Sequence, residues 1–503
     1  MTRVRKDVFK LTKQEDWPEE LVAYERGVGL MRAADPDTGP PTEPTGWQFM
    51  AAIHGRATDD GQVDTSNPMW SSCQHGSWFF LPWHRMYLAA FERIVQDYLG
   101  DEEWSLPYWY SIDPDRPRRG ILPAAFRDTS RPGNNLHTTQ RARRVNRGRP
   151  IHGQVPFEAL TEGLGDALAA GRYATADGIA AFGGGQRARP SFFGPEQGLL
   201  EGTPHGAVHV LVGGDRGGWM SSFFTAALDP IFWLHHCNLD RLWQVWLDLG
   251  HRSPRRKRAW MDTSFTFPAP GGSTVTWTVA EVLDTRALGY EYDDVDPPSG
   301  VAAALDRPAP KEAPEVETPE REVARLRKQA TPPTEETELE TPPKVIGVAA
   351  DVDLSAATTV EIPLSEATPA GTRTYLRVEG LTGTAAVPAY TVYLDVPEGE
   401  APADHPELRV GALSSFGLAE ASVPSESNDG DGLTVILDVT AVRSLLEADG
   451  RWDDGAVRVS FVPVPPADDE AGDDEAGDGD DLEGTSPPDA HARRLALVTA
   501  PTG

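Results

Sequence analysis

The amino-acid sequence predicts a multidomain protein in which a mainly helical bundle with long loops precedes an all-β sandwich. Two stretches, 84–99 and 230–249, carry apolar side chains at intervals of three and four residues, the spacing of an amphipathic helix. After residue 346 the interval changes to two, which is typical of half-buried strands. The intervening segment is rich in Pro, Glu and Thr and too poor in apolar residues to fold alone. We therefore expect a helical domain over 1–295, a linker over 296–345 and a sandwich over 346–503.

The helical domain should contain the largest apolar core, because most of the tryptophans lie before residue 280. Its second predicted helix opens at Pro230, a favoured first-turn residue, and ends before Gly250. Residues 113–200 are rich in Pro, Gly and Arg and should form long loops with short helices. The arginines of 141–149 have no stacking aromatics beside them, which favours a solvated loop face over a phosphate site.

The sandwich is predicted from the alternation of apolar and polar residues in 390–396, 433–440 and 457–464. Residues 494–500 have the composition of one more strand. Before that strand, residues 468–483 contain ten Asp or Glu and no base. We expect a disordered acidic insertion over 467–490 rather than an acidic tail.

The overall composition excludes some classes of partner. A net charge of -31 argues against binding to nucleic acid or to an anionic membrane surface. No apolar run is long enough to cross a bilayer, and the first residues lack an apolar signal core. These features favour a cytoplasmic protein, although export with a carrier partner would leave no trace in this sequence.

Six of the twelve histidines fall into two groups of three with metal-ligand spacing. The first group is His54, His75 and His84, and the second is His205, His209 and His236. Neutral imidazole binds copper, nickel, zinc and iron, so the residue type leaves the metal open. The glutamate of a zinc-protease H-E-x-x-H helix is missing between the first two histidines of the second group.

The predicted helices suggest how the rings converge. One helix begins at His84 and another contains His236, so several helices can direct their rings into one bundle and build a dinuclear site. Asp240 lies one turn after His236, where we expect it to hydrogen-bond a ligand imidazole and orient that ring.

Two long motifs connect these histidines to a known family. The segment His75-x4-Phe80-Leu-Pro-Trp-His84-Arg85-x2-Leu88-x3-Glu92 resembles the copper-A signature of tyrosinases, catechol oxidases and mollusc-type haemocyanins. The segment Asp229-Pro-x-Phe232-Trp-x2-His236-x3-Asp240 resembles the copper-B signature of the same family, about 150 residues later. The resemblance covers residues 1–295, and the sandwich resembles the family's C-terminal shielding domain more weakly.

The resemblance implies a type-3 pair of copper ions that oxidises o-diphenols to o-quinones with O2. It assigns His54, His75 and His84 to copper A, and His205, His209 and His236 to copper B. His235 then lies behind the ligands. Six neutral ligands without a carboxylate suit a centre that changes between Cu(I) and Cu(II).

Cys73, two residues before His75, resembles the family cysteine that forms a thioether to that histidine ring. The alternative is a free buried thiol. Cys237 follows a ligand on a helix and is expected to pack in the core.

Three further positions bear on the substrate. Glu201 matches the family glutamate that helps to hold a water near copper, whereas Gly206 replaces the asparagine that usually assists it. Phe223 matches the bulky gate residue of plant catechol oxidases, or it is an ordinary core residue. These features favour diphenol oxidation, while monophenol hydroxylation as in a tyrosinase and o-aminophenol oxidation are alternatives.

The family also includes oxygen carriers, but the chain has a single set of copper ligands and no internal repeat, which favours an enzyme. In relatives the shielding domain keeps the enzyme latent, so we expect Phe416 to plug the site until an activating protease cuts the linker. Alternatively, the sandwich only stabilises the bundle or binds a partner. Small phenols, O2, and a copper chaperone are further expected partners.

Overall fold

The computed structural model describes most of the chain. The described residues are 2–12, 16–36, 39–153, 155–174, 178–194, 196–214, 217–299, 342–369, 371–384, 390–424, 429–452, 455–464 and 489–501. The predicted linker at 296–345 and the predicted acidic insertion at 467–490 lie almost wholly outside these residues.

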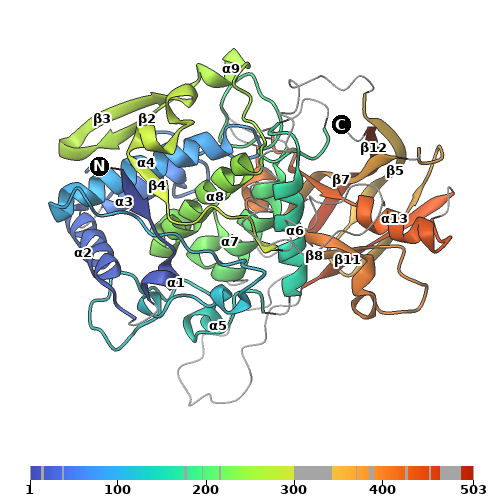
Figure 1. Cartoon of the computed structure of the whole chain (residues 1–503), viewed down its shortest axis with the longest axis horizontal. Coiled ribbons are helices and arrows are strands. Elements are labelled where there is room, and N and C mark those ends of the chain that lie inside the picture. Colours follow the sequence, from blue (N-terminus) through green and yellow to red (C-terminus); the bar gives the residue numbers. More distant parts are fainter. Residues whose placement is uncertain are drawn as a thin grey trace, which may run out of the picture.

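The first part of the chain is mainly helical and contains a few short strands (Figure 1). Its α-helices are α1 (Val8–Leu11), α2 (Glu19–Ala34), α3 (Trp47–His54), α4 (Phe80–Leu99), α5 (Arg143–Asn146), α6 (Phe157–Ala169), α7 (Gly206–Gly213), α8 (Pro230–Asp248) and α9 (Arg258–Met261). A π-helical turn, η3 (Glu201–His205), precedes α7. Shorter 3-10 turns cover Pro117–Gly120, Ala124–Phe126, Trp219–Ser221, Ala226–Leu228, Pro270–Gly272, Val279–Val282 and Thr285–Leu288.

Both long helices predicted from apolar spacing are confirmed. In α8 the Asp229 side chain caps the first turn by accepting from the Ile231 amide at 3.0 Å, and Pro230 follows as the first helical residue. Helix α4 starts four residues earlier than predicted, because Pro82 falls in its first turn, where a backbone donor has no partner in any case. It ends at Gly100, whose φ of 64° is the left-handed conformation that glycine adopts readily.

Two small sheets in the helical part were not predicted from the sequence. Strand β1 (Arg3–Arg5) pairs in parallel with β4 (Tyr290–Tyr292), and thereby joins the two ends of the helical part. Strands β2 (Ser264–Ala269) and β3 (Ser273–Thr278) form an antiparallel hairpin. Strands of three to six residues carry too few alternating positions to stand out from loops.

The second part is the predicted sandwich of two four-stranded antiparallel sheets. One sheet has the order β10-β7-β12-β5 and the other the order β6-β11-β8-β9. The strands are β5 (Lys344–Asp353), β6 (Thr358–Pro363), β7 (Thr372–Gly383), β8 (Tyr390–Leu394), β9 (Arg409–Leu413), β10 (Leu433–Asp438), β11 (Ala456–Pro463) and β12 (Ala490–Pro501), with helices α12 (Leu418–Ala421) and α13 (Thr440–Ala448) and 3-10 turns at Pro402–Asp404 and Pro406–Leu408. The four predicted strand segments coincide with β8, β10, β11 and β12.

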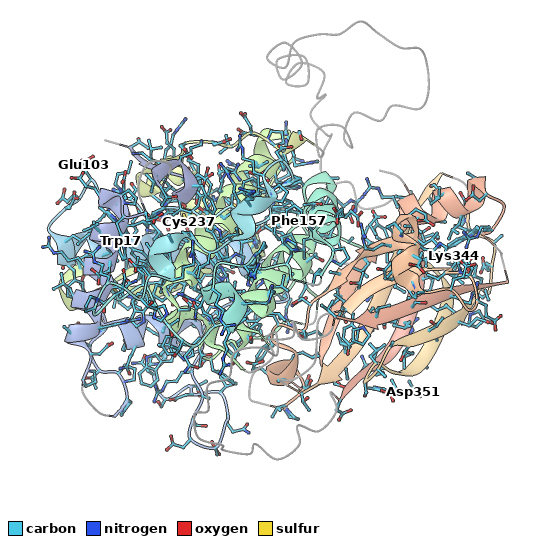
Figure 2. The ribbon with its side chains drawn as sticks, turned by 90° about the horizontal axis from the view of Figure 1, so that it is seen from below. Trp17, Glu103, Phe157, Cys237, Lys344 and Asp351 are labelled. Atoms are coloured by element: carbon cyan, nitrogen blue, oxygen red, sulfur yellow. The ribbon has the colours of Figure 1, made fainter. Side chains whose placement is uncertain are left out.

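The sandwich packs directly on the helical part. In Figure 2, Phe157 at the start of α6 lies between Cys237, in the helical part, and Lys344, in the sandwich. Arg409 of β9 forms a two-pronged ion pair with Glu162 of α6, at 2.9 and 3.0 Å. Buried apolar residues of both parts belong to one continuous core, so the interface is an extension of the two interiors.

Among the described residues, no helix combines the length and apolar character needed to cross a bilayer.

Candidate metal centre

Six histidine rings from five helical elements and one loop of the helical part converge in its interior. His54 ends α3, His84 lies in the first turn of α4 and His236 lies in α8, while His205 and His209 lie in η3 and α7. His75 comes from the loop before α4. The rings of His84 and His236 stack with centroids 4.5 Å apart, and His54 and His75 meet edge to face at 5.3 Å. All six side chains are at most 3% exposed.

Four of the rings are oriented by hydrogen bonds from Nδ1 to backbone carbonyls. His54 and His84 donate to Phe223 and Phe80 at 2.9 and 2.8 Å. His205 donates to Glu201 at 3.1 Å and His209 to Met220 at 2.9 Å. A carbonyl can only accept, so each Nδ1 carries the ring proton and each Nε2 keeps a free lone pair.

These Nε2 lone pairs face one another without hydrogen-bond donors, so they are available to bind metal ions. The Nε2 atoms of His54, His75, His84 and His205 are buried and form no hydrogen bond with any described residue. The Nε2 atoms of His209 and His236 lie 3.2 Å apart. Buried polar atoms normally have a partner, and metal ions would supply the missing ones here.

Electrostatics keeps the rings neutral. Burial, together with the neighbouring histidines, lowers the pKa of His75, His84, His205, His209 and His236 well below the ordinary value. Burial likewise lowers the pKa of His54 to about 4. Neutral imidazole is the form that binds a metal, so little proton loss would oppose binding at neutral pH.

The nitrogen atoms do not separate into two clean triads. His236 shares one compact group with His205, His209 and His235, and another with His54 and His84, each with ligand atoms within 4.8 Å of one another. The assignment of three rings to each of two ions therefore stays a prediction, as does the placing of His235 behind the ligands.

The predicted thioether partners are adjacent. Cys73 Sγ lies 3.3 Å from His75 Nδ1, next to the ring carbon that a thioether would join. Burial raises the pKa of the Cys73 thiol well above its ordinary value. The neighbourhood fits the predicted bond, which itself stays a prediction.

Glu201 lies at the start of η3, beside the rings. Its Oε1 accepts from the Gly76 amide at 2.8 Å, while its buried Oε2 forms no hydrogen bond with any described residue. Burial raises the pKa of Glu201 to about 8. The π-helical turn that carries Glu201 contains Pro204, which lacks a backbone donor, and such turns are frequent at functional sites.

Two phenylalanines cover the rings. Phe223 stacks on His75 with centroids 4.1 Å apart, and Phe416 of the sandwich stacks on His209 at 3.9 Å. The two phenylalanines also meet edge to face at 4.5 Å. Both are at most 1% exposed, so the sandwich places an aromatic ring directly over the histidines.

Further contacts hold this part of the sandwich in place. Glu420 in α12 accepts from the Ser222 hydroxyl at 2.7 Å and from the Phe223 amide at 3.0 Å. A side-chain carbon on Gly206 would lie 2.7 Å from the hydroxyl of Ser414, so the sandwich approaches Gly206 closely. Sequence reasoning missed Glu420 and Ser222, because no spacing signal links residues 198 positions apart.

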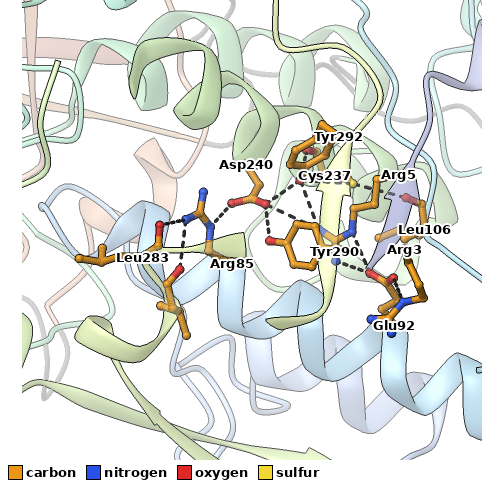
Figure 3. A network of polar contacts seen from close by, with 11 residues as sticks. Arg3, Arg5, Arg85, Glu92, Leu106, Cys237, Asp240, Leu283, Tyr290 and Tyr292 are labelled. Atoms are coloured by element: carbon orange, nitrogen blue, oxygen red, sulfur yellow. Dashed lines mark hydrogen bonds and ion pairs between the residues drawn. The ribbon is translucent and has the colours of Figure 1, made fainter. Parts of the chain in front are cut away.

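The prediction for Asp240 is wrong. Its carboxylate accepts from Arg85 Nε and from the hydroxyls of Tyr290 and Tyr292, both at 2.6 Å, rather than from a ligand imidazole (Figure 3). Arg5 Nη1 also lies 3.6 Å from Asp240 Oδ2 and forms an ion pair with it. The helical turn does place Asp240 near the ligands, but the two arginines outcompete an imidazole for a buried carboxylate.

This network joins the helices that carry the rings to the ends of the helical part. Arg5 also pairs with Glu92 of α4, and Arg85 donates to the Val282 and Leu283 carbonyls at 3.1 and 3.3 Å. Figure 3 shows these side chains meeting between α4, β1 and β4. Arg85 and Asp240 directly connect α4 with α8, so the network holds His84 and His236 at a set separation.

Comparison with family models identifies three regions. Residues 44–249 match the common central domain of tyrosinase, and residues 256–300 match the polyphenol oxidase middle domain. Residues 333–472 match a domain of unknown function, DUF7868.

Whole proteins give the same result. The chain is 30% identical to tyrosinase HcTyr1 of Hahella sp. over 93% of this chain and 97% of that protein. It is 29% identical to the chloroplastic polyphenol oxidase of Malus domestica over 55% of this chain, a match that spans 46% of the plant protein. The structure of latent apple tyrosinase has the same fold, with a TM-score of 0.62 and 22% identity, over 99% of this chain and 97% of that one.

These comparisons contradict the expected cytoplasmic location. Plant relatives from Malus domestica, Larrea tridentata, Ipomoea batatas and Solanum lycopersicum are chloroplastic proteins. The expectation rested on the lack of a signal in the first residues, and such a lack does not identify the compartment.

Proposed function

The chain belongs to the tyrosinase and polyphenol oxidase family of type-3 copper oxidoreductases, and from this premise we propose that it oxidises o-diphenols to o-quinones with O2. Two diphenols would supply the four electrons and four protons that reduce one O2 to two waters. The supporting observation is the set of buried Nε2 atoms that face one another without hydrogen-bond partners among the described residues.

The proposed ligands are His54, His75 and His84 for copper A, and His205, His209 and His236 for copper B. Bound copper supplies the uptake of O2 and accepts the electrons of the diphenol. The chain contributes the orientation of the rings, because backbone carbonyls hold four of them by Nδ1. It also excludes water, since the site is enclosed by Phe223 and Phe416.

For the substrate, we propose diphenols in preference to monophenols. A monophenol must lose its hydroxyl proton at the site. We propose that a water accepts this proton when it is held by Glu201 Oε2 together with a neighbouring side chain. Gly206 offers no side chain for this purpose. Phe223, stacked on His75, would narrow the entrance for bulky phenols. Monophenol hydroxylation and o-aminophenol oxidation are the alternatives that the assay below separates.

We also propose that the sandwich keeps the enzyme latent, with Phe416 as the plug. Its ring occupies the face of His209, where a phenol ring would otherwise stack. Glu420 and Arg409 hold the sandwich against the helical part by hydrogen bonds and an ion pair. A protease that cuts the proposed linker at 296–345 would separate the domain 1–295 from the shield 346–503.

Copper delivery is a related proposal. The six ligand side chains are at most 3% exposed, so an ion cannot reach them while the sandwich is closed. Copper would then enter before the shield docks, or a metallochaperone would bind the open form.

Assays of catechol, tyramine and 2-aminophenol, with copper-loaded protein before and after limited proteolysis, test these proposals. We expect o-quinone formation from catechol to rise on cleavage and to exceed the reaction with tyramine. Phe416→Ala in the intact chain should also raise the rate, whereas Val423→Ala, at an exposed site of the shield, should not. Reversible O2 binding without turnover would instead indicate a carrier, and unchanged rates after cleavage would refute latency.

A further inference from the structure

A second concave site lies beside α3, the helix that ends at His54. It is a cavity of about 460 Å³ lined in part by this helix. Its walls include Arg32 at the end of α2, Trp47 and Gln48 at the start of α3, and Trp219 and Phe224 from the segment after α7. The volume falls within the range of about 300–1,000 Å³ that is typical of small-molecule sites.

The cavity contains a guanidinium group without an acceptor. Arg32 is half-buried, and no described carboxylate or carbonyl lies within hydrogen-bond or ion-pair distance of it. Its guanidinium lies 5.4 Å from the ring of Trp47. A buried cation is costly unless it is paired, so this fork of donors is available to an anion.

The nearby carboxylates are already engaged. Both oxygens of Asp35 accept from the Gln48 amide at 3.1 Å, and burial raises the pKa of Asp35 to about 6. The second arginine of the wall, Arg56, pairs with Asp64 at 2.9 Å. Asp35 and Asp229 act on Arg32 only through space, so among the described residues of the wall its guanidinium is the one cation without a bound acceptor.

The remaining wall is aromatic. Trp47, Trp219 and Phe224 all line the cavity, and His137 adds an imidazole whose pKa is lowered by burial. Flat aromatic walls bind planar rings by stacking, while a guanidinium fork binds a carboxylate through two parallel hydrogen bonds.

We propose that this cavity binds a small aromatic carboxylate, with the carboxylate on Arg32 and the ring between Trp47, Trp219 and Phe224. The site is separate from the metal centre, but it adjoins the segment that orients one ligand. Gly55 packs so closely on Phe223 that a side-chain carbon there would lie 2.3 Å from the Phe223 carbonyl, which accepts from His54. Gly55 and Phe224, which follow His54 and Phe223 in the chain, both line the cavity.

Isothermal titration of the copper-loaded full chain with 1-naphthoate tests the proposal, and 1-naphthamide serves as the uncharged analogue. We expect 1-naphthoate to bind with a Kd of about 1 mM or lower, and 1-naphthamide at least about tenfold more weakly. Arg32→Gln should weaken 1-naphthoate binding by a similar factor. Arg286→Gln, at an arginine whose side chain is 72% exposed, is the matched control and should bind like the wild type.

A second variant covers the case in which Arg32→Gln fails to fold. Gln48 is exposed at the mouth of the cavity, so Gln48→Glu should fold normally and weaken the acid more than the amide by charge repulsion. The proposal is overturned if 1-naphthoate does not bind, if acid and amide bind equally, or if neither variant changes the affinity. If 1-naphthoate bound at the copper ions instead, both variants would keep the wild-type affinity, because neither substitution changes a copper ligand.

Discussion

Replacing Asp240 by Asn should destabilise the helical part strongly, because this carboxylate neutralises two buried arginines. Arg5 and Arg85 have side chains that are 0% exposed, and Asp240 accepts from Arg85 and from the hydroxyls of Tyr290 and Tyr292. Asn has nearly the same shape but no charge, and its amide nitrogen would face donors. The substitution therefore leaves buried cations uncompensated rather than creating a cavity.

The expected magnitude follows from this arrangement. Removing one partner of a buried ion pair costs about 3–5 kcal/mol. Arg85 retains the Val282 and Leu283 carbonyls, and Arg5 retains Glu92, which favours the lower half of that range. With an unfolding entropy of about 2.1 cal/mol/K per residue, a helical part of roughly 300 residues loses about 1.6 °C per kcal/mol, so the melting temperature should fall by about 5–6 °C.

The dependence on pH gives a second measurement. Burial by itself would raise the pKa of Asp240, but Arg85 and Arg5 outweigh it and hold the pKa below the ordinary value of 3.8. A lowered carboxyl pKa contributes stability that is present above the unfolded pKa and is lost as the pH falls through the folded one. The difference between wild type and Asp240→Asn should therefore be full at pH 7 and shrink below about pH 4.

Thermal and urea unfolding of the copper-loaded protein measure the effect. Glu291→Gln is the matched control, since its ion pair with Arg286 is exposed and should contribute less than about 1 kcal/mol. A loss of under about 1 kcal/mol for Asp240→Asn, no larger than an ordinary surface change, would refute the role of the network.

Four other outcomes are expected. Gly206→Asn should raise tyramine turnover in the proteolysed protein, and in the intact chain it should also weaken docking of the shield, because the new side chain meets Ser414; unchanged ratios of tyramine to catechol would contradict this. Glu420→Ala should raise catechol oxidation by the intact chain, whereas Glu420→Gln, which keeps an acceptor, should not. Peptide mass spectrometry should find Cys73 and His75 joined with the loss of two hydrogens, and Cys73→Ser should abolish that species. Removing copper with a chelator should lower the melting temperature, and added cupric ions should restore it. If free copper stood at 1,000 times its Kd before removal, the free energy of unfolding should fall by about 4 kcal/mol.

Much of the site followed from local spacing. A helix brings residues three and four apart to one face, so the positions of His84, His205, His209 and His236 in apolar helical segments already predicted converging rings. The sandwich followed from a period of two, which survives in any half-buried strand. These signals depend on a few neighbouring residues and need no knowledge of distant contacts.

The sequence by itself determined the two long helices that carry His84 and His236, the helical spacing of His205 and His209, four of the sandwich strands and the family motifs. Only the tertiary structure decided which distant groups meet: Asp240 with Tyr290 and Arg85, Phe416 with His209, and Arg32 with the aromatic cavity. The physical reason is that a buried polar or aromatic side chain chooses its partner by geometry and charge among everything folded around it. Residues separated by tens or hundreds of positions leave no periodic trace of that choice in the sequence.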